Sequence, residues 1–221
     1  RLWAETGDPW HYAYPFDFQG GLALYTGDYE KARDNFQHGL EIFRKYGSVG
    51  MVHQLVSFLG HATYGLGELD KAEEHYLESN TLAFEYGSFP YLAVNYYCLG
   101  NIELRRGNYH QAAELFQKAL LDGVKYKVQQ VAVISMAGLA AAALNQGETQ
   151  KSAHLFGAFQ RQREQYLAMV GRTKLPFPLV FREEINQNLA RCKEKLDPVD
   201  FETCWQEGYQ MTMEAILDQV K

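Results

Sequence analysis

Apolar residues recur at helical spacing through the first three quarters of the chain, in pairs of segments separated by a glycine. The stretch from Leu99 to Leu121 shows the pattern most clearly. Leu99 and Ile102 share one face of the first segment, Phe116 lies on the matching face of the second, and Gly107 stands between them. The pattern predicts a helical hairpin whose apolar faces meet. A single hairpin of this kind leaves apolar surface uncovered and needs neighbours.

The same pattern returns every 40 residues in four copies. Turn glycines, small residues on the first helix and aromatic residues on the second helix all keep this step: Gly27, Gly67, Gly107 and Gly147; Gly20, Gly60, Gly100 and Ala140; Phe36, Tyr76, Phe116 and Phe156. The small residue allows close approach within a hairpin, and we expect the aromatic ring to fill the gap to the next hairpin. The sequence therefore predicts an all-α fold, a right-handed superhelix of hairpins about 40 residues long.

These residues resemble the tetratricopeptide repeat. The family pattern of a small residue, a turn glycine, an alanine, an aromatic residue and a second small residue corresponds here to Gly100, Gly107, Ala112, Phe116 and Ala119. The usual unit has about 34 residues, so the 40-residue step implies longer helices. The fourth copy departs from the pattern, with Ser152 for the alanine and Phe159 for the second small residue.

The period also predicts the domain organisation. We expect a repeat array over residues 1–169, with repeats at 8–47, 48–87, 88–127 and 128–169, and a helical cap over 170–221. Residues 1–7 match the end of a second helix, so we expect the chain to be a fragment with at least one further repeat upstream. The alternative is a short native cap at this end.

Capping residues predict where the helices begin and end. Asp8, Ser48 and Ser88 are placed to cap the first helices of three hairpins, with Pro9 and Pro90 in the first turns. Pro15 is expected to kink its helix or to mark its true start. Helix ends are expected near the glycines that can take a left-handed conformation, which are Gly27, Gly47, Gly67, Gly87 and Gly107.

The period stops after Tyr166. The segment Gly171 to Pro178 carries two prolines and predicts a loop. Phe181, Ile185, Leu189, Cys192 and Leu196 then follow at helical spacing. Asp197 and Thr212 are placed to cap two further helices, the first with Pro198 at its start and the second carrying Ala215, Ile216 and Val220. This tail predicts a helical cap on the array.

Composition narrows the possible functions. A 221-residue chain with 47% hydrophobic and 14% aromatic residues is typical of a globular protein. No apolar run is long enough to predict a membrane span, and a net charge of −6 argues against direct binding of nucleic acid. Three scattered cysteines, Cys98, Cys192 and Cys204, favour a reducing, cytoplasmic location.

The tail carries a second resemblance. Its residues are Ala153 to Ala158, Asn188 to Arg191, Phe201, Trp205 to Gly208, and Met211 to Ile216. They are similar to the C-terminal end of the MalT-, LuxR- and AfsR-like bacterial regulators, and similar tails occur in some multidomain cyclases and kinases. The resemblance implies a regulatory arm that receives a protein partner or a small-molecule inducer. The alternative is a free-standing scaffold that assembles other proteins.

Catalysis is the third hypothesis, and the residues argue against it. The histidines form no HExxH pattern, and none lies within five residues of another: His11, His38, His53, His61, His75, His110 and His154. Cys98 lies in an aromatic and apolar run that is typical of a core position. We expect no catalytic site, no metal site and no cofactor.

The resemblance to tetratricopeptide repeats implies a concave binding face on the first helices. Its residues would be Tyr14, Asp17 and Tyr25; Gln54, Ser57 and His61; and Tyr97, Asn101 and Arg105, followed by the mostly apolar Ile134, Ala137, Ala141 and Asn145. This mixture suits a peptide or a small organic ligand. Alternatively, Tyr14, Tyr25 and Tyr97 pack against neighbouring hairpins.

Two other roles for these helices are disfavoured. A clamp for chaperone tails needs Lys and Asn on adjacent repeats, and only Asn101 and Arg105 match part of it. Self-association is the alternative role for the apolar residues Val131, Val133, Ile134 and Leu139, but inside a solenoid such residues usually serve the next hairpin. We therefore expect a monomer in isolation and no chaperone-tail receptor.

Overall fold

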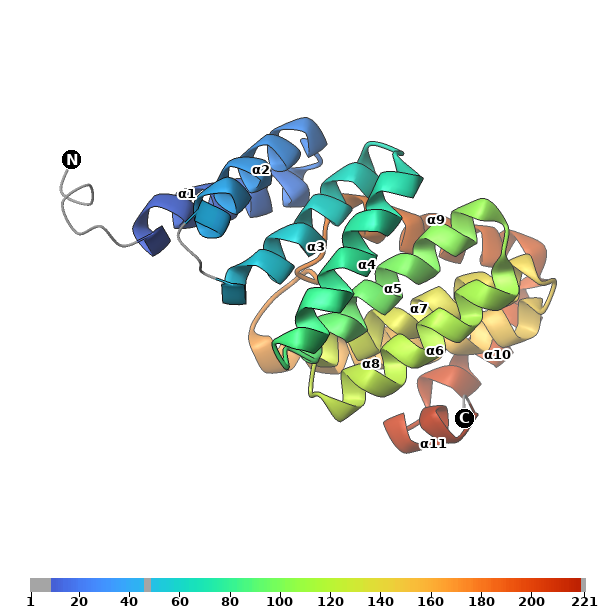
Figure 1. The fold of residues 1–221 in the computed structure, drawn as a ribbon. Helices are drawn as coiled ribbons and strands as arrows, with labels where there is room; N and C mark the ends of the chain where they lie inside the picture. Colours follow the sequence, from blue (N-terminus) through green and yellow to red (C-terminus); the bar gives the residue numbers. More distant parts are fainter. Residues whose placement is uncertain (1–8, 46–48, 220–221) are drawn as a thin grey trace. The chain divides into compact units, whose positions relative to one another are not determined.

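The fold is built of helices throughout the part of the chain that can be described. A computed structural model describes residues 9–45 and 49–219, and over these ranges it contains eleven helices and no strand (Figure 1). The helices are α1 (Pro9–Thr26), α2 (Tyr29–Lys45), α3 (Val49–Gly65), α4 (Leu69–Glu85), α5 (Pro90–Arg106), α6 (Tyr109–Lys125), α7 (Gln129–Asn145), α8 (Thr149–Val170), α9 (Leu179–Lys195), α10 (Pro198–Tyr209) and α11 (Met213–Gln219). The predicted all-α fold of helical hairpins is confirmed.

Some predictions fall on residues outside this description. They concern the repeat end at 1–7, the cap at Asp8, the turn from Tyr46 to Ser48, and Val220. These stay predictions.

The described residues divide into two compact units. The first holds the residues up to Tyr91 together with Phe177–Val180, and the second holds Leu92–Pro176 and the residues from Phe181 onward. Helices α5 and α9 therefore each give their first two residues to the first unit. Within the first unit α1, α2, α3 and α4 pack in chain order, and within the second α6, α7 and α8 do so. The repeat boundaries expected from the sequence stay a prediction.

Helix length and turn chemistry follow the period. Each helix from α2 to α7 has 17 residues. The turns use glycines with positive φ, from 68° to 88°, at Gly27, Gly67, Gly87, Gly107 and Gly147. A left-handed residue ends a helix because its N–H can bond back to the last turn. The described glycine turns are therefore where the sequence placed them.

The recurring glycine and aromatic residue contact each other inside a hairpin. A Cβ built on Gly60 of α3 would lie 2.5 Å from the Tyr76 ring of α4, and one on Gly20 of α1 would lie equally close to the Phe36 ring of α2. The Phe36 ring also reaches the next hairpin, where its centroid is 5.2 Å from that of Phe58. The sequence predicted only the second of these contacts. The first explains why glycine recurs, since any side chain would displace the ring.

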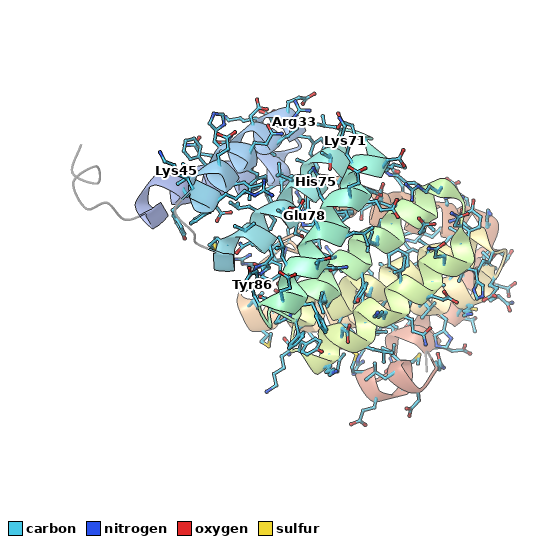
Figure 2. The ribbon with its side chains drawn as sticks, viewed as in Figure 1. Arg33, Lys45, Lys71, His75, Glu78 and Tyr86 are labelled. Atoms are coloured by element: carbon cyan, nitrogen blue, oxygen red, sulfur yellow. The ribbon has the colours of Figure 1, made fainter. Side chains whose placement is uncertain are left out.

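The second helices carry the charged surface of the first unit (Figure 2). Arg44 of α2 bonds Glu78 of α4 at 2.9 Å, and Lys71 bonds Glu68 at the same distance across one helical turn. Both pairs are exposed, so each contributes little to stability.

The tail forms the elements expected of it. Residues 171–178 have no helix, and α9 follows. The Asp197 carboxylate accepts a hydrogen bond from Val199 N at 2.9 Å, and the Thr212 hydroxyl accepts one from Ala215 N at 3.2 Å. Both predicted caps are therefore present at the starts of α10 and α11.

Two details differ from the prediction. Of the two alternatives for Pro15, the helix start is wrong, because α1 begins at Pro9 and runs through Pro15. The kink stays a prediction, since a proline inside a helix removes one backbone bond and its ring clashes with the carbonyl four residues earlier. Ser88 lies one residue too early to cap α5, whose first residue is Pro90, and its carbonyl instead accepts a bond from Tyr91 N at 3.1 Å.

Helices α8 and α10 cross at two glycines. A Cβ on Gly157 of α8 would collide with the Trp205 carbonyl of α10, and a Cβ on Gly208 of α10 would collide with the His154 carbonyl of α8. The two tail segments of the second resemblance, Ala153 to Ala158 and Trp205 to Gly208, are therefore in backbone contact. A need for close packing accounts for both glycines.

Candidate functional site

In the first unit the expected face divides into exposed rings and covered polar groups. Tyr14 and Tyr25 of α1 are 59% and 40% exposed, and Asp17 and Gln54 are half-buried. Ser57 and His61 of α3 are buried. A ligand that approaches these helices would meet the tyrosines, Asp17 and Gln54 before it met Ser57 and His61.

His61 has a structural partner. Its Nδ1 lies 2.8 Å from the hydroxyl of Tyr76, which belongs to the second helix of the same hairpin. Burial lowers the pKa of His61 to about 3, so the imidazole is neutral at pH 7. These contacts explain the burial of His61 without a ligand.

A group of three polar residues comes together from α1, α3 and the start of α5, and only one of them, Asp17, was expected on the binding face. The ring centroids of His53 in α3 and Tyr91 are 4.7 Å apart, edge to face. Asp17 is close enough to Tyr91 for its charge to help burial raise the tyrosine pKa to about 12. Tyr91 therefore links His53 to Asp17, and we call these three residues the Asp17 cluster.

The Asp17 cluster holds polar atoms without hydrogen-bond partners among the described residues. They are Oδ1 of Asp17 and both ring nitrogens of His53. His53 is only 3% exposed. Burial lowers the pKa of His53 and raises the pKa of Asp17, because it disfavours the charged form of each side chain. Buried polar atoms normally have partners. The sequence contains one signal that could have identified His53 as unusual. The equivalent positions 40 residues before and after it hold alanine, Ala13 and Ala93, where this repeat has a histidine.

In the second unit the expected face is covered by a helix of the chain itself. Tyr97 and Asn101 of α5 are buried, and the Tyr97 ring meets that of Phe181 in α9 edge to face, with centroids 5.6 Å apart. Arg105 donates from Nε to Glu184 Oε1 at 2.7 Å. Burial and the Glu184 carboxylate both raise the pKa of Tyr97. Binding of a ligand to these three residues would require α9 to move.

Helix α9 also reaches the fourth repeat. Arg191 donates to Asn145 Oδ1 at the end of α7, at 3.1 Å. Cys192 is buried, with its sulfur 3.8 Å from the Thr149 carbonyl of α8. Helix α9 thus lies on the first-helix face of the second unit (Figure 1), and the cap expected over residues 170–221 stays a prediction. The sequence showed an amphipathic helix but did not indicate which surface it covers.

Two cavities open on another side of the second unit, one beside each end of α11. A cavity of about 360 Å³ includes His154, Lys151, Gln146 and, from α11, Gln219. A cavity of about 520 Å³ includes Tyr166, Met169, Lys127 and, from α11, Met213. His154 Nε2 is buried without a partner among the described residues.

The apolar residues considered for self-association and the cysteine considered for catalysis lie inside the second unit. Val131, Val133, Ile134 and Leu139 are buried, as is Cys98. In the ranges 9–45 and 49–219, no three His, Cys, Asp or Glu side chains are grouped to hold a metal ion. None of the described helices combines the length and the apolar character needed to cross a membrane.

Comparisons with known proteins assign no family. No protein-family model matches the chain, and no curated protein shows significant sequence similarity to it.

Proposed function

We propose that this chain is a non-catalytic, protein- or ligand-binding repeat domain that acts as the sensory or regulatory arm of a larger bacterial transcriptional regulator. The observation that carries the binding role is the Asp17 cluster, where buried polar atoms of Asp17 and His53 have no partner among the described residues. Leaving such atoms unpaired costs about 1–3 kcal/mol each. A bound ligand that pairs with them recovers this energy.

The chemistry of the Asp17 cluster defines the ligand class. A neutral His53 offers one donor and one acceptor, and the Asp17 carboxylate accepts. The exposed Tyr14 ring on the same helix as Asp17 offers an apolar surface with a polar tip. A peptide or a small amide-containing molecule supplies both N–H donors and carbonyl acceptors for such a site.

A stripe of exposed apolar residues on α1 supports membership of a larger protein. Phe18 is 69% exposed and Leu22 is 56% exposed. Forty residues after Phe18, Phe58 packs on Phe36 of the preceding second helix. Forty residues after Tyr25, a Cβ on Gly65 would collide with the Tyr29 ring of that same helix. The exposed residues of α1 therefore occupy the same repeat positions as the α3 residues that pack on a preceding hairpin.

The regulatory role depends on the resemblance of the tail to the MalT-, LuxR- and AfsR-like proteins. The chain contains no GxxxxGK[ST] motif, so nucleotide binding would belong to another part of the protein. The complete reading frame tests this role. A nucleotide-binding loop upstream or a helix-turn-helix segment at either end is the expected result, and a frame with neither contradicts it.

Binding to the Asp17 cluster can be tested with a displayed library of random peptides selected on the full chain. We expect Asp17→Ala and His53→Ala to weaken the selected peptides at least about tenfold, because each removes a buried partner. Gln19→Ala, on an exposed position of α1, is the matched control and should not change affinity. Peptides that bind all four proteins equally would move the site away from the cluster.

A scaffold that assembles other proteins is the second candidate function. It is favoured by the two cavities beside α11, which lie on different helices from the Asp17 cluster and give the chain a second open surface. A reading frame without nucleotide-binding or DNA-binding segments, combined with peptide binding, would support the scaffold over the regulator.

A further inference from the structure

Helix α9 lies on the first helices of the second unit in the way a bound helical ligand would. Its contacts with α5 and α7 include one aromatic pair and two polar pairs: Phe181 with Tyr97, Glu184 with Arg105, and Arg191 with Asn145. All three partners belong to the expected inner face of α5 and α7. The expected binding face of this unit is therefore already occupied.

The spacing of these contacts matches the spacing of the repeats. Arg105 and Asn145 are 40 residues apart, at the same position of successive hairpins. Glu184 and Arg191 are seven residues apart, which on one face of a helix is about 10.5 Å. Neighbouring packed helices lie about 8–10 Å apart. Successive hairpins therefore contact residues of α9 that lie two helical turns apart.

Much of α9 remains exposed. Phe181 and Cys192 are buried, whereas the opposite side of the helix is in solvent: Glu183, Asn186, Gln187, Ala190, Lys193 and Glu194. The Arg105 and Glu184 side chains are 31% and 20% exposed. Because part of each side chain is open to solvent, water and salt screen this pair to some extent. Besides this pair, α9 is held by the buried Phe181 and Cys192, by the Arg191–Asn145 bond, by Lys193, whose Nζ lies 5.5 Å from the Phe201 ring centroid of α10, and by its covalent tether.

We propose that the α5–α7 face is a helix-binding groove that α9 fills in the absence of a partner, and that an amphipathic helix of a partner protein replaces α9 there. The partner helix carries an aromatic residue, a carboxylate three residues later and a guanidinium seven residues after that. This inference builds on the proposed role in protein binding and specifies a second site for it, on the other unit.

The probe is a fluorescein-labelled peptide of residues 177–196, measured by anisotropy with the full chain. In the wild-type chain the tethered α9 competes at the high effective concentration that a short linker gives. The variant Phe181→Ala/Glu184→Ala weakens the internal copy. This variant is expected to bind the peptide at least about tenfold more tightly than wild type does, because the α5–α7 face is free of α9 in a larger fraction of the molecules. Glu183→Ala, on the exposed side of α9, is the matched control and should bind as wild type does.

Charge reversal identifies the groove. Adding Arg105→Glu to the opened variant is expected to weaken the peptide at least about tenfold. A peptide carrying Glu184→Arg should restore binding to that chain. Equal affinity of the peptide for the wild-type, opened and Arg105→Glu chains would overturn the proposal.

A further measurement uses the wild-type chain, so its result does not depend on whether the variants fold. In amide hydrogen exchange, α9 is expected to exchange faster than α7, because release of α9 requires only local opening. Equal protection of α9 and α7 would contradict the proposal. A negative result here leaves the peptide selection on Asp17 and His53 unaffected, so the two proposals fail separately.

Discussion

The Cα of Gly100 in α5 lies against the ring of Phe116 in α6, so that a Cβ on residue 100 would come within 2.7 Å of Phe116 Cε1. The ring is held from two further sides. Gly138 of α7 is as close to it as Gly100, and the Tyr97 ring centroid is 5.6 Å away. Because Phe116 has no free direction in which to move, Gly100 cannot take a side chain without strain.

Gly100→Ala is therefore expected to destabilise the protein by about 1–3 kcal/mol, even though alanine is the better helix former. Gly21→Ala is the matched control, because Gly21 is helical and nothing lies within 4 Å of its Cβ position. The control should stabilise the protein by about 0.5–1 kcal/mol. Urea unfolding of both variants measures the difference, and changes of the same sign would show that the Gly100 contact is unimportant.

Gly208→Ala is expected to cost about 3 kcal/mol or more, because the obstacle is the His154 backbone carbonyl and not a side chain that can turn away. The loss should appear as faster amide exchange in α8 and α10. Glu207→Ala, at the exposed neighbouring position, should leave both helices protected. Normal protection in Gly208→Ala would refute the close crossing of α8 and α10.

Lys127 has a φ of 60° where the previous repeat has Gly87. A side chain costs about 1–2 kcal/mol in this conformation, so Lys127→Gly is expected to stabilise the protein by about 1 kcal/mol. Lys118→Gly, within α6, is the matched control and should destabilise it by about 1 kcal/mol. Thermal unfolding distinguishes the two, and a loss of stability in Lys127→Gly would argue against the left-handed turn.

The buried His61 makes stability depend on pH. Its pKa is lowered from 6.5 to about 3 on folding, so between these values the unfolded chain binds a proton that the folded chain does not. The free energy of unfolding therefore falls as pH drops from about 6.5 toward 3, by up to about 1.4 kcal/mol per pH unit.

His61→Gln is expected to flatten this slope. Burial lowers the pKa of His53 and His75 as well, so these residues contribute with the same sign and some slope remains in the variant. The free energies of unfolding of wild type and variant are measured by urea unfolding at pH 4, 5, 6 and 7. The difference between their pH slopes gives the contribution of His61. Identical slopes would mean that His61 is accessible to protons in the folded protein.

The sequence by itself determined the repeating part of the architecture. The 40-residue period located the hairpins, the described turn glycines and the contact of Phe36 with the next hairpin, because these depend on local conformation and on contacts that recur at fixed spacing. The caps at Asp197 and Thr212 were equally readable, since each satisfies a backbone N–H two or three residues away.

Only the tertiary structure decided which surfaces are open. It buried His53 beside Tyr91, placed α9 over Tyr97 and Arg105, and brought Gly157 against α10. These contacts join segments 38 to 84 residues apart in the sequence, and the 40-residue period by itself specifies none of them. A periodic pattern reports which side of a helix is apolar. It does not report which distant segment covers that side, because that choice depends on the shape of both surfaces after the hairpins have packed.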